Sequence, residues 1–247
     1  MTHNKVAGVV IGLMQALRVP ISLLPFWHGH IGAERNLYRP FLQPWRADAL
    51  FRSVWNDVGG DTTSLEEWAY LLFSLAKMAA KRPGEFWECG VYKGATARLL
   101  AEARNFRAGG GPLPALRLFD TFAGVPERRP SVDGYKLGSL GDTSLDRVKA
   151  RLASYDKIDI RSGLIPATFA GLEASSIAFA HVDVVQYETT KACCEFIVPR
   201  LVTGGILVID DYGRPKTSGC RLAADEYFAA HRITPLVLNT GQAVILN

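Results

Sequence analysis

The hydrophobic residues of this chain follow two patterns that take turns along most of its length. Short, almost continuously apolar runs, typical of strands buried on both faces of a sheet, occur at residues 85–88, 116–120, 158–161, 177–185, 206–210, 235–238 and 242–246. One segment with helical periodicity precedes the first of these runs: it extends from Leu65 to Met78 and follows Thr63 and Ser64. Further helical segments lie between the runs, at residues 95–104, 144–154, 187–201 and 220–230. This order predicts an α/β fold: a doubly wound, mostly parallel seven-stranded sheet covered by helices on both faces.

The N-terminal region has a pattern of its own. An apolar helical face runs through it until Pro20 ends the periodicity, and its members are Val6, Val10, Leu13, Met14 and Leu17. The uninterrupted apolar stretch is too short to span a bilayer, and no clear small-residue cleavage site follows it. We therefore expect no membrane span, a helical extension or cap over residues 1–60, and one domain over residues 61–247.

Charge and cysteine content narrow the function classes. The chain has 28 basic and 24 acidic residues, and the basic ones form no stripe interleaved with aromatic residues, which argues against a nucleic-acid partner. Of the four cysteines, Cys193 and Cys194 are adjacent and no CxxC spacing occurs, so no zinc site is expected. Reduced, buried thiols are typical of a cytoplasmic protein, which is the location we predict.

The segment E-C-G-V-Y-K-G joins the first predicted strand to the helix that follows it. Its glycines permit a sharp turn and bring the backbone close to a ligand at the helix N-terminus. The candidate cofactor-binding residues of this segment are Glu88, Cys89, Gly90, Tyr92 and Gly94. Taken alone, the spacing is weak, because other doubly wound nucleotide binders share it and many strand-to-helix turns contain glycine for geometry alone.

Asp120 ends the second predicted strand and is followed by Thr121. In this topology an acid at that place can accept hydrogen bonds from both ribose hydroxyls of a nucleoside; the alternative is that Asp120 caps the turn after it. A dinucleotide would require G-x-G-x-x-G, whereas Gly90 and Gly94 are separated by bulky and charged residues. Because the acid Glu88 also suits a cofactor with an amino group, the pattern favours S-adenosylmethionine.

Three further acids follow predicted strands. Asp183 lies at the carboxyl end of the fourth, and Asp210 and Asp211 end the fifth. Adjacent parallel strands would bring all three to one edge of the sheet, where carboxylates without basic partners repel one another and attract a hard cation such as magnesium. Such a metal can bind an acceptor oxygen and lower its pKa. The alternative is that the acids cap helices or face water.

Four segments carry a resemblance to a known family: F-D-T-F-A-G-V-P, H-V-D-V-V-Q-Y-E-T-T, G-G-I-L-V-I-D-D-Y-G and G-C-R-L-A-A-D-E-Y-F. Together they resemble the macrocin O-methyltransferase (TylF-like) family, from about Thr62 to the C-terminus. The resemblance implies a class I methyltransferase that uses S-adenosylmethionine to methylate sugar hydroxyls of natural products. It also implies cofactor contacts from residues 88–94 and Asp120, magnesium held by Asp183, Asp210 and Asp211, and frequent dimers.

One position departs from the pattern of that family. After the fourth strand the family usually has D-x-D-x-Y-E-S, whose second acid is a candidate general base, and this chain has Val185 there. Valine accepts no proton, so either the metal alone acidifies the acceptor hydroxyl or another group takes the proton. His181 and a residue of the loop 127–142 are the alternatives. Asp183 and His181 are thus the candidate catalytic residues, although a lone histidine at a strand end also suits a structural role.

The sequence does not name the acceptor. The polar loop 126–142 is interrupted by glycine and proline and is either a lid over the cofactor or a plain surface loop. The expected partner is a small molecule with a hydroxyl group, and a second copy of the chain is also a candidate. Two other functions stay open, a protein that binds S-adenosylmethionine without efficient catalysis and a nicotinamide-dependent oxidoreductase.

Overall fold

The computed structural model describes residues 42–107, 110–126 and 129–247. Residues Trp45–Asn247 form one compact unit. The apolar helix expected around Val6 and Leu17 lies outside the described residues. Within the described part of the chain, no helix is long and apolar enough to cross a membrane.

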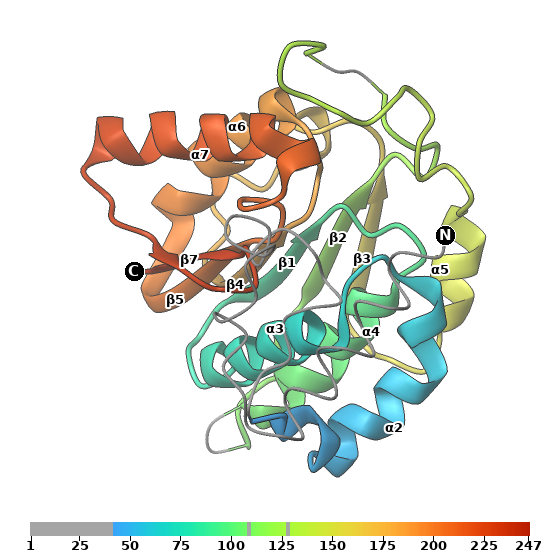
Figure 1. Cartoon of the computed structure of the whole chain (residues 1–247). Helices are drawn as coiled ribbons and strands as arrows, with labels where there is room; N and C mark the ends of the chain where they lie inside the picture. Colours follow the sequence, from blue (N-terminus) through green and yellow to red (C-terminus); the bar gives the residue numbers. More distant parts are fainter. Residues whose placement is uncertain (1–41, 108–109, 127–128) are drawn as a thin grey trace, which may run out of the picture. The chain divides into compact units, whose positions relative to one another are not determined.

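Seven strands form one sheet in the order β3-β2-β1-β4-β5-β7-β6 (Figure 1). Their bounds are β1 Glu85–Cys89, β2 Leu116–Asp120, β3 Ile158–Ser162, β4 Ile177–Val182, β5 Leu201–Ile209, β6 Leu236–Val237 and β7 Ala243–Leu246. Strands β1 to β5 run parallel, whereas β7 is antiparallel to β5 and β6. The predicted doubly wound, mostly parallel sheet is confirmed. Its order reverses between β1 and β4, which is where such sheets bind ligands.

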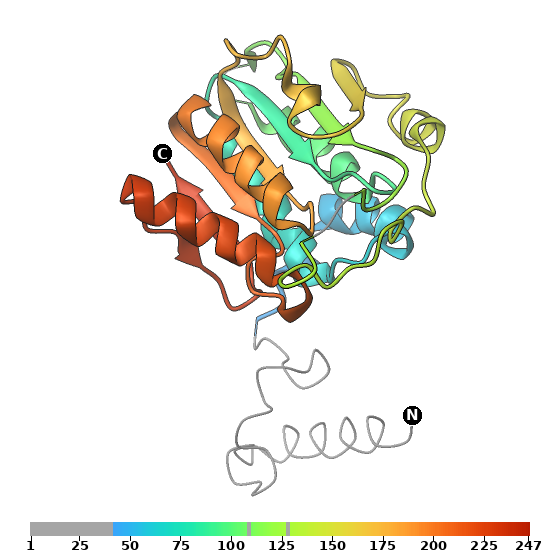
Figure 2. The same ribbon diagram turned by 90° about the horizontal axis from the view of Figure 1, so that it is seen from above.

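Both faces of the sheet are covered. On β1, Phe86 packs into a cluster with residues of α2, α3 and α4, while its neighbour Trp87 packs into a second cluster with residues of α6 and α7. Figures 1 and 2 show α6 and α7 side by side on one face of the sheet and α3 and α4 on the other. This double burial explains why the strands appear in the sequence as continuous apolar runs.

The helices are α2 Ala49–Val58, α3 Glu66–Ala79, α4 Ala95–Ala103, α5 Leu145–Arg151, α6 Tyr187–Ile197 and α7 Ser218–His231. Short 3-10 turns lie at Pro44–Arg46, Gly59–Asp61, Arg104–Phe106, Ala167–Phe169, Val198–Arg200 and Pro215–Thr217. Helix α2 begins where the Asp48 carboxylate accepts a hydrogen bond from the amide of Phe51 over 2.9 Å. It buries Phe51 and Val54 in the core shared with α3 and α4, so the packed domain starts before the boundary at residue 61 expected from the sequence.

Three predicted bounds differ from the structure. Strand β4 ends at Val182 rather than at Val185, because Val185 has φ +56°, which an extended strand does not contain. Helix α6 ends at Ile197 rather than at Leu201, since Pro199 has no amide hydrogen to donate. Strand β5 already begins at Leu201, where it pairs with the start of β4, instead of at residue 206.

Candidate active site

One cavity opens at the carboxyl ends of β1, β2 and β4. Its wall contains residues 61–63 before α3, 90–92, 95 and 96 after β1, 119–121 and 124–126 at the end of β2, 163–165 after β3 and 183–186 and 189 after β4, together with Tyr135, Leu140 and Arg214. The candidate site residues that line it are Gly90, Tyr92, Asp120, Thr121 and Asp183. Those that lie outside its lining are Glu88, Cys89, Gly94, His181, Asp210 and Asp211.

The glycine turn after β1 is tightly held between its neighbours. Gly90 has φ +87°, and a Cβ added there would lie 1.9 Å from the carbonyl oxygen of Asp183, so only glycine fits. The amide of Gly90 donates to Phe119 on β2 over 2.8 Å, and the Asp183 amide donates to the carbonyl of Cys89 over 2.8 Å. The turn therefore fixes the ends of β1, β2 and β4 relative to one another. It also exposes backbone atoms of Gly90, which has no side chain, to the cavity.

Helix α4 starts directly after this turn. Gly94 precedes it in a left-handed conformation and offers no side-chain cap, and Thr96 in the first turn of the helix lines the cavity. An uncapped helix start favours a negatively charged ligand group, because its amides point outward. Thr96 was missed from the sequence; its place in the first turn after a glycine loop is the signal that could have found it.

The Asp120 carboxylate accepts hydrogen bonds from backbone amides of two turns, one after β1 and one after β2. Its Oδ2 accepts hydrogen bonds from the amides of Val91 and Tyr92 over 2.7 and 2.8 Å, and its Oδ1 accepts one from the amide of Phe122 over 2.8 Å. The turn-capping role that the sequence left open is thus present. Oδ1 retains the capacity to accept a second hydrogen bond, and the carboxylate lines the cavity, so a ribose contact stays a prediction.

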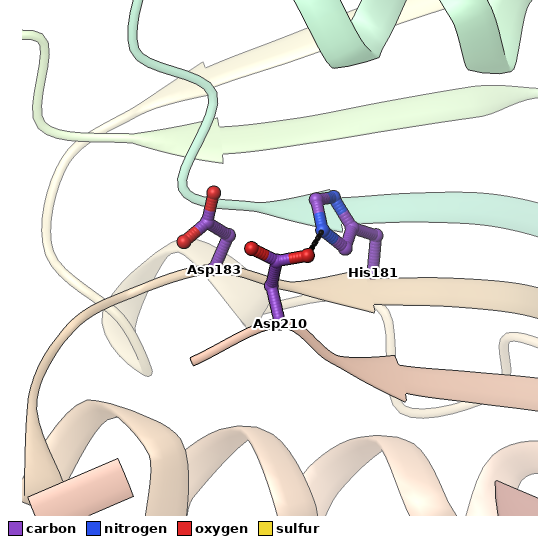
Figure 3. A group of neighbouring side chains, drawn as sticks. All are labelled: His181, Asp183 and Asp210. Carbon is purple, nitrogen blue, oxygen red and sulfur yellow. Dashed lines mark ion pairs between the residues drawn. The ribbon is translucent and has the colours of Figure 1, made fainter. Parts of the chain in front are cut away.

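A row of three charged side chains crosses the sheet beneath the cavity. Glu88 and His181 are direct neighbours on β1 and β4, and Glu88 Oε1 lies 2.9 Å from His181 Nδ1. On the other side, Nε2 of His181 lies 3.6 Å from Asp210 Oδ1 (Figure 3). Burial lowers the pKa of His181, but its contacts with Asp210 and Glu88 outweigh burial and raise the pKa to about 10. The two carboxylates thus favour the imidazolium form of His181.

This row bears on two expectations. His181 is fully buried and lies outside the cavity lining, and its carboxylate neighbours favour its protonated form, so the geometry is against its role as a general base. Glu88 is fully buried as well, and its Oε1 is directed at His181 rather than at the cavity. Its Oε2 is buried without a hydrogen-bond partner among the described residues, so a contact of Glu88 with a cofactor amino group stays a prediction.

The carboxylates of Asp183, Asp210 and Asp211 converge as the sequence predicted. One ligand atom each from Asp183, Asp210 and His181 lie within 4.8 Å of one another. Burial together with repulsion from the other two acids raises the pKa of Asp183 well above its usual value. Burial would also raise the pKa of Asp210, but His181, Arg214 and Gln242 lower it. The Gln242 amide donates to Asp210 Oδ1 over 2.6 Å.

The expectation that these acids lack basic partners is wrong. Besides His181, Arg214 faces the cluster, with its Nε 3.4 Å from Asp211 Oδ1. Even so, Asp210 Oδ2 and both oxygens of Asp211 are buried and receive no hydrogen bond from any described residue. Together with Glu88, the three acids make four carboxylates, which face two cations, His181 and Arg214. The carboxylate oxygens that receive no hydrogen bond are hard ligands of the kind that magnesium prefers. The residues present therefore fit a divalent cation.

Val185 occupies a strained position on the cavity wall. Its φ of +56° is in the left-handed region, which a β-branched residue adopts at a cost of about 1–2 kcal/mol. The side chain is almost fully buried and lines the cavity beside Asp183. Asp and Asn tolerate this conformation better than valine does, since their short polar side chains bond locally. The backbone is thus shaped for the residue type that the resemblance implies at this place.

Part of the loop 126–142 is fixed to the helices beside the cavity. The buried carboxylate of Asp133 accepts hydrogen bonds from the amides of Arg129 and Tyr187, over 2.7 and 3.0 Å, and so caps the start of α6. The amide of Gly134 donates to Lys216 before α7 over 2.9 Å. These contacts deliver Tyr135 to the cavity wall. Sequence reasoning named this loop without singling out Tyr135, and only its tertiary contacts select it.

The arrangement of strands and helices is that of the class I methyltransferases. The calicheamicin methyltransferase CalS11 aligns with 85% of this chain and 98% of its own, at a TM-score of 0.62 and 19% identity. An O-methyltransferase from Bacillus cereus, solved in complex with S-adenosylhomocysteine, aligns with 99% of this chain and 100% of its own, at a TM-score of 0.53 and 13% identity. At these identities the likeness shows the fold.

Residues 74–244 match the model of the macrocin O-methyltransferase (TylF) family, and the chain belongs to that family. A relative from Streptomyces olivaceus, 8-demethyl-8-(2,3-dimethoxy-alpha-L-rhamnosyl)-tetracenomycin-C 4'-O-methyltransferase, is 27% identical over an alignment of 163 residues. The alignment covers 62% of this chain and 60% of the relative. The chain spans about 60% of the length of the curated relatives it matches.

Proposed function

We propose that this protein is an S-adenosylmethionine-dependent O-methyltransferase that acts on a hydroxyl group of a sugar or related natural product, assisted by magnesium. One observation carries the proposal. A single cavity joins the glycine turn and Asp120, the predicted cofactor end, to Asp183 and Val185, the predicted acceptor end. A methyl donor and a hydroxyl acceptor can therefore bind next to each other in one cavity at the edge of the sheet.

At the cofactor end, the chain provides groups suited to a nucleoside with an amino acid tail. Asp120 offers the free capacity of Oδ1 to ribose hydroxyls, and the backbone at Gly90 permits close approach. Thr96, in the uncapped first turn of α4, is placed for a carboxylate. The neighbouring Tyr92 is held in place because its hydroxyl donates to Asp142 over 2.7 Å. S-Adenosylmethionine supplies an electrophilic methyl group on a sulfonium.

At the acceptor end, the transfer breaks the bond between sulfur and methyl carbon, forms the bond between that carbon and the acceptor oxygen, and releases the hydroxyl proton. Asp183 is the candidate catalytic residue that lines the cavity, whereas His181 lies behind it. We therefore assign to Asp183 the contact with the acceptor hydroxyl. Burial and the neighbouring acids raise its pKa, which brings a carboxyl group closer to the range of a general base.

Magnesium would be held by Asp183, Asp210 and Asp211. The buried, unpaired oxygens of Asp210 and Asp211 and the closeness of Asp183 to Asp210 support this assignment. When bound, the ion supplies a Lewis acid that lowers the pKa of a coordinated hydroxyl. The acceptor class follows from the family and from the relative named for a rhamnosyl tetracenomycin. Val185 supports a second candidate function, binding of S-adenosylmethionine without efficient catalysis, because it removes one carboxylate from the acceptor end.

One experiment distinguishes the two candidate functions. The protein is incubated with S-adenosylmethionine labelled in its methyl group, magnesium and a panel of deoxysugar glycosides and catechols, and labelled products are identified by mass spectrometry. Transfer to any hydroxyl, abolished in Asp183→Asn, supports the enzyme. Retained S-adenosylhomocysteine in native mass spectra without transfer to any acceptor supports the binding protein. Failure to bind S-adenosylhomocysteine at all overturns both, and a retained dinucleotide would point to an oxidoreductase.

A further inference from the structure

Arg214 lies beside the acidic cluster (Asp183, Asp210 and Asp211) and lines the cavity together with Asp183. Its guanidinium Nε lies 3.4 Å from Asp211 Oδ1, and its side chain is only 16% exposed. The guanidinium carbon lies 4.3 Å from the centre of the Trp68 ring on α3, which covers one face of the planar group. The residue also lines the cavity, so a group that enters from the cavity toward Asp211 meets Arg214.

A turn that is held by hydrogen bonds positions the guanidinium of Arg214 beside Asp211. The amide of Arg214 donates to the Asp211 carbonyl over 3.3 Å, and the hydroxyl of Thr217 donates to the same carbonyl over 2.8 Å. On the other side, Gly213 donates to Gly241 over 2.7 Å. Since Asp211 and Arg214 are three residues apart within this turn, the cation is held at the acid by local backbone contacts and not by a flexible loop.

The pairing of Arg214 with Asp211 is electrostatic but incomplete. Nε and Nη2 of Arg214 are buried without a hydrogen-bond partner among the described residues, and so are both oxygens of Asp211. Their separation of 3.4 Å exceeds the usual range for an N–H···O hydrogen bond, 2.7–3.2 Å. Glu88 Oε1 lies within hydrogen-bond distance of His181, whereas Asp211 is neutralised by a neighbour that does not bond it directly.

We propose that Arg214 is a resident counter-ion of the acidic cluster, which keeps the carboxylates together without metal and weakens the binding of a divalent cation by competing for Asp211. The inference rests on the proposed function only in taking Asp183, Asp210 and Asp211 as the metal ligands. A metal ion and the Arg214 guanidinium are both positively charged and repel each other at short range. Binding of the metal beside Asp211 therefore requires the guanidinium to shift toward the cavity. Arg214 already interacts with Tyr135, which lines the cavity.

The test measures metal binding directly. Manganese, which binds oxygen ligands as magnesium does, is titrated by calorimetry into the full-length wild type and into Arg214→Met, Arg214→Gln and Arg214→Lys. We expect both neutral variants to bind manganese at least tenfold more tightly than the wild type, and the lysine variant to stay within about threefold of it. Arg221→Met is the matched control, because Arg221 is exposed and pairs with Asp225 away from the cluster, and it should leave manganese affinity unchanged.

A second measurement guards against misfolding. In metal-free buffer the neutral variants should melt at a lower temperature than the wild type, and manganese should raise their melting temperature more than it raises that of the wild type. Equal or weaker manganese binding in every folded neutral variant overturns the proposal. Binding of S-adenosylhomocysteine, measured on the same proteins without metal, keeps this failure separate from a failure of the proposed methyl transfer.

Discussion

Glu88 and His181 form an ion pair inside the sheet, with 2.9 Å between Oε1 and Nδ1 and no solvent exposure on either side chain. The sequence assigned the first to a cofactor and the second to proton transfer. Their positions opposite each other on β1 and β4 instead make them one unit, extended by Asp210 on the far side of the imidazole. Asp210 therefore belongs both to this unit and to the acidic cluster, and it connects the two.

Removal of the imidazolium should destabilise the protein strongly. His181→Ala leaves Glu88 and Asp210 as buried carboxylates with one cation fewer, which typically costs about 3–5 kcal/mol. Urea unfolding followed by fluorescence measures the difference. His231→Ala is the control, because His231 is exposed at the end of α7, and it should cost less than about 1 kcal/mol. A loss below that level in His181→Ala would show that the pair contributes little.

The ion pair of Glu85 with Arg117 predicts a pH dependence of stability. Arg117 donates to both Glu85 oxygens over 2.6 and 2.7 Å, and Trp87 donates to one of them over 2.9 Å. Burial raises the pKa of Glu85, but these donors outweigh it and lower the pKa below 4.5. The stabilisation, about 1 kcal/mol for a half-buried pair, is thus present above pH 4.5 and lost as pH falls through the lowered pKa. Unfolding curves of wild type and Glu85→Gln should differ at pH 7 and converge as pH falls below the lowered pKa of Glu85.

Asp120→Ala tests the cofactor end. The substitution removes an acceptor for three backbone amides and the expected ribose contact, so affinity for S-adenosylhomocysteine should fall about tenfold to hundredfold, or about 1.5–3 kcal/mol. Calorimetry measures it, with Asp146→Ala on the exposed surface of α5 as control. Unchanged affinity in a folded Asp120→Ala protein would remove Asp120 from the site.

Asp211→Asn tests the metal assignment. The amide keeps the shape of the side chain but lowers the negative charge, so manganese affinity should fall while the fold stays intact. Turnover of the wild type in excess chelator completes the test. Methyl transfer that survives the chelator at full rate would exclude a catalytic role for the metal.

Val185→Asp tests the missing carboxylate, with Val185→Asn as its matched partner. Both variants relieve the strain of a β-branched residue at φ +56°, and only aspartate adds a base. A positioned base typically contributes about 10²–10⁴-fold to proton removal, and metal coordination replaces part of that. We expect faster turnover of a sugar-like acceptor in Val185→Asp than in the wild type and in Val185→Asn, compared over pH at saturating magnesium. If aspartate is slower at every pH, the proton leaves through another group.

Local patterns in the sequence determined the fold and the edge where the site lies. Apolar runs that are buried on both faces, separated by amphipathic helices, specify a parallel sheet, and acids at strand ends must gather at one edge because parallel strands end together. The motifs around Gly90, Asp120 and Asp210 also sufficed for the family. Each of these signals is carried by residues close together in the chain.

Contacts between distant residues decided the rest. Periodicity gives a strand its faces but not its register, so the sequence could not show that Glu88 faces His181 and neutralises it across two strands. Nor could it place Tyr135, which reaches the cavity because the buried Asp133 caps a helix more than fifty residues away. Arg214 carried no signal as an isolated basic residue. A turn places the Arg214 guanidinium next to the Asp211 carboxylate inside the protein. The low dielectric there strengthens the attraction between the two charges.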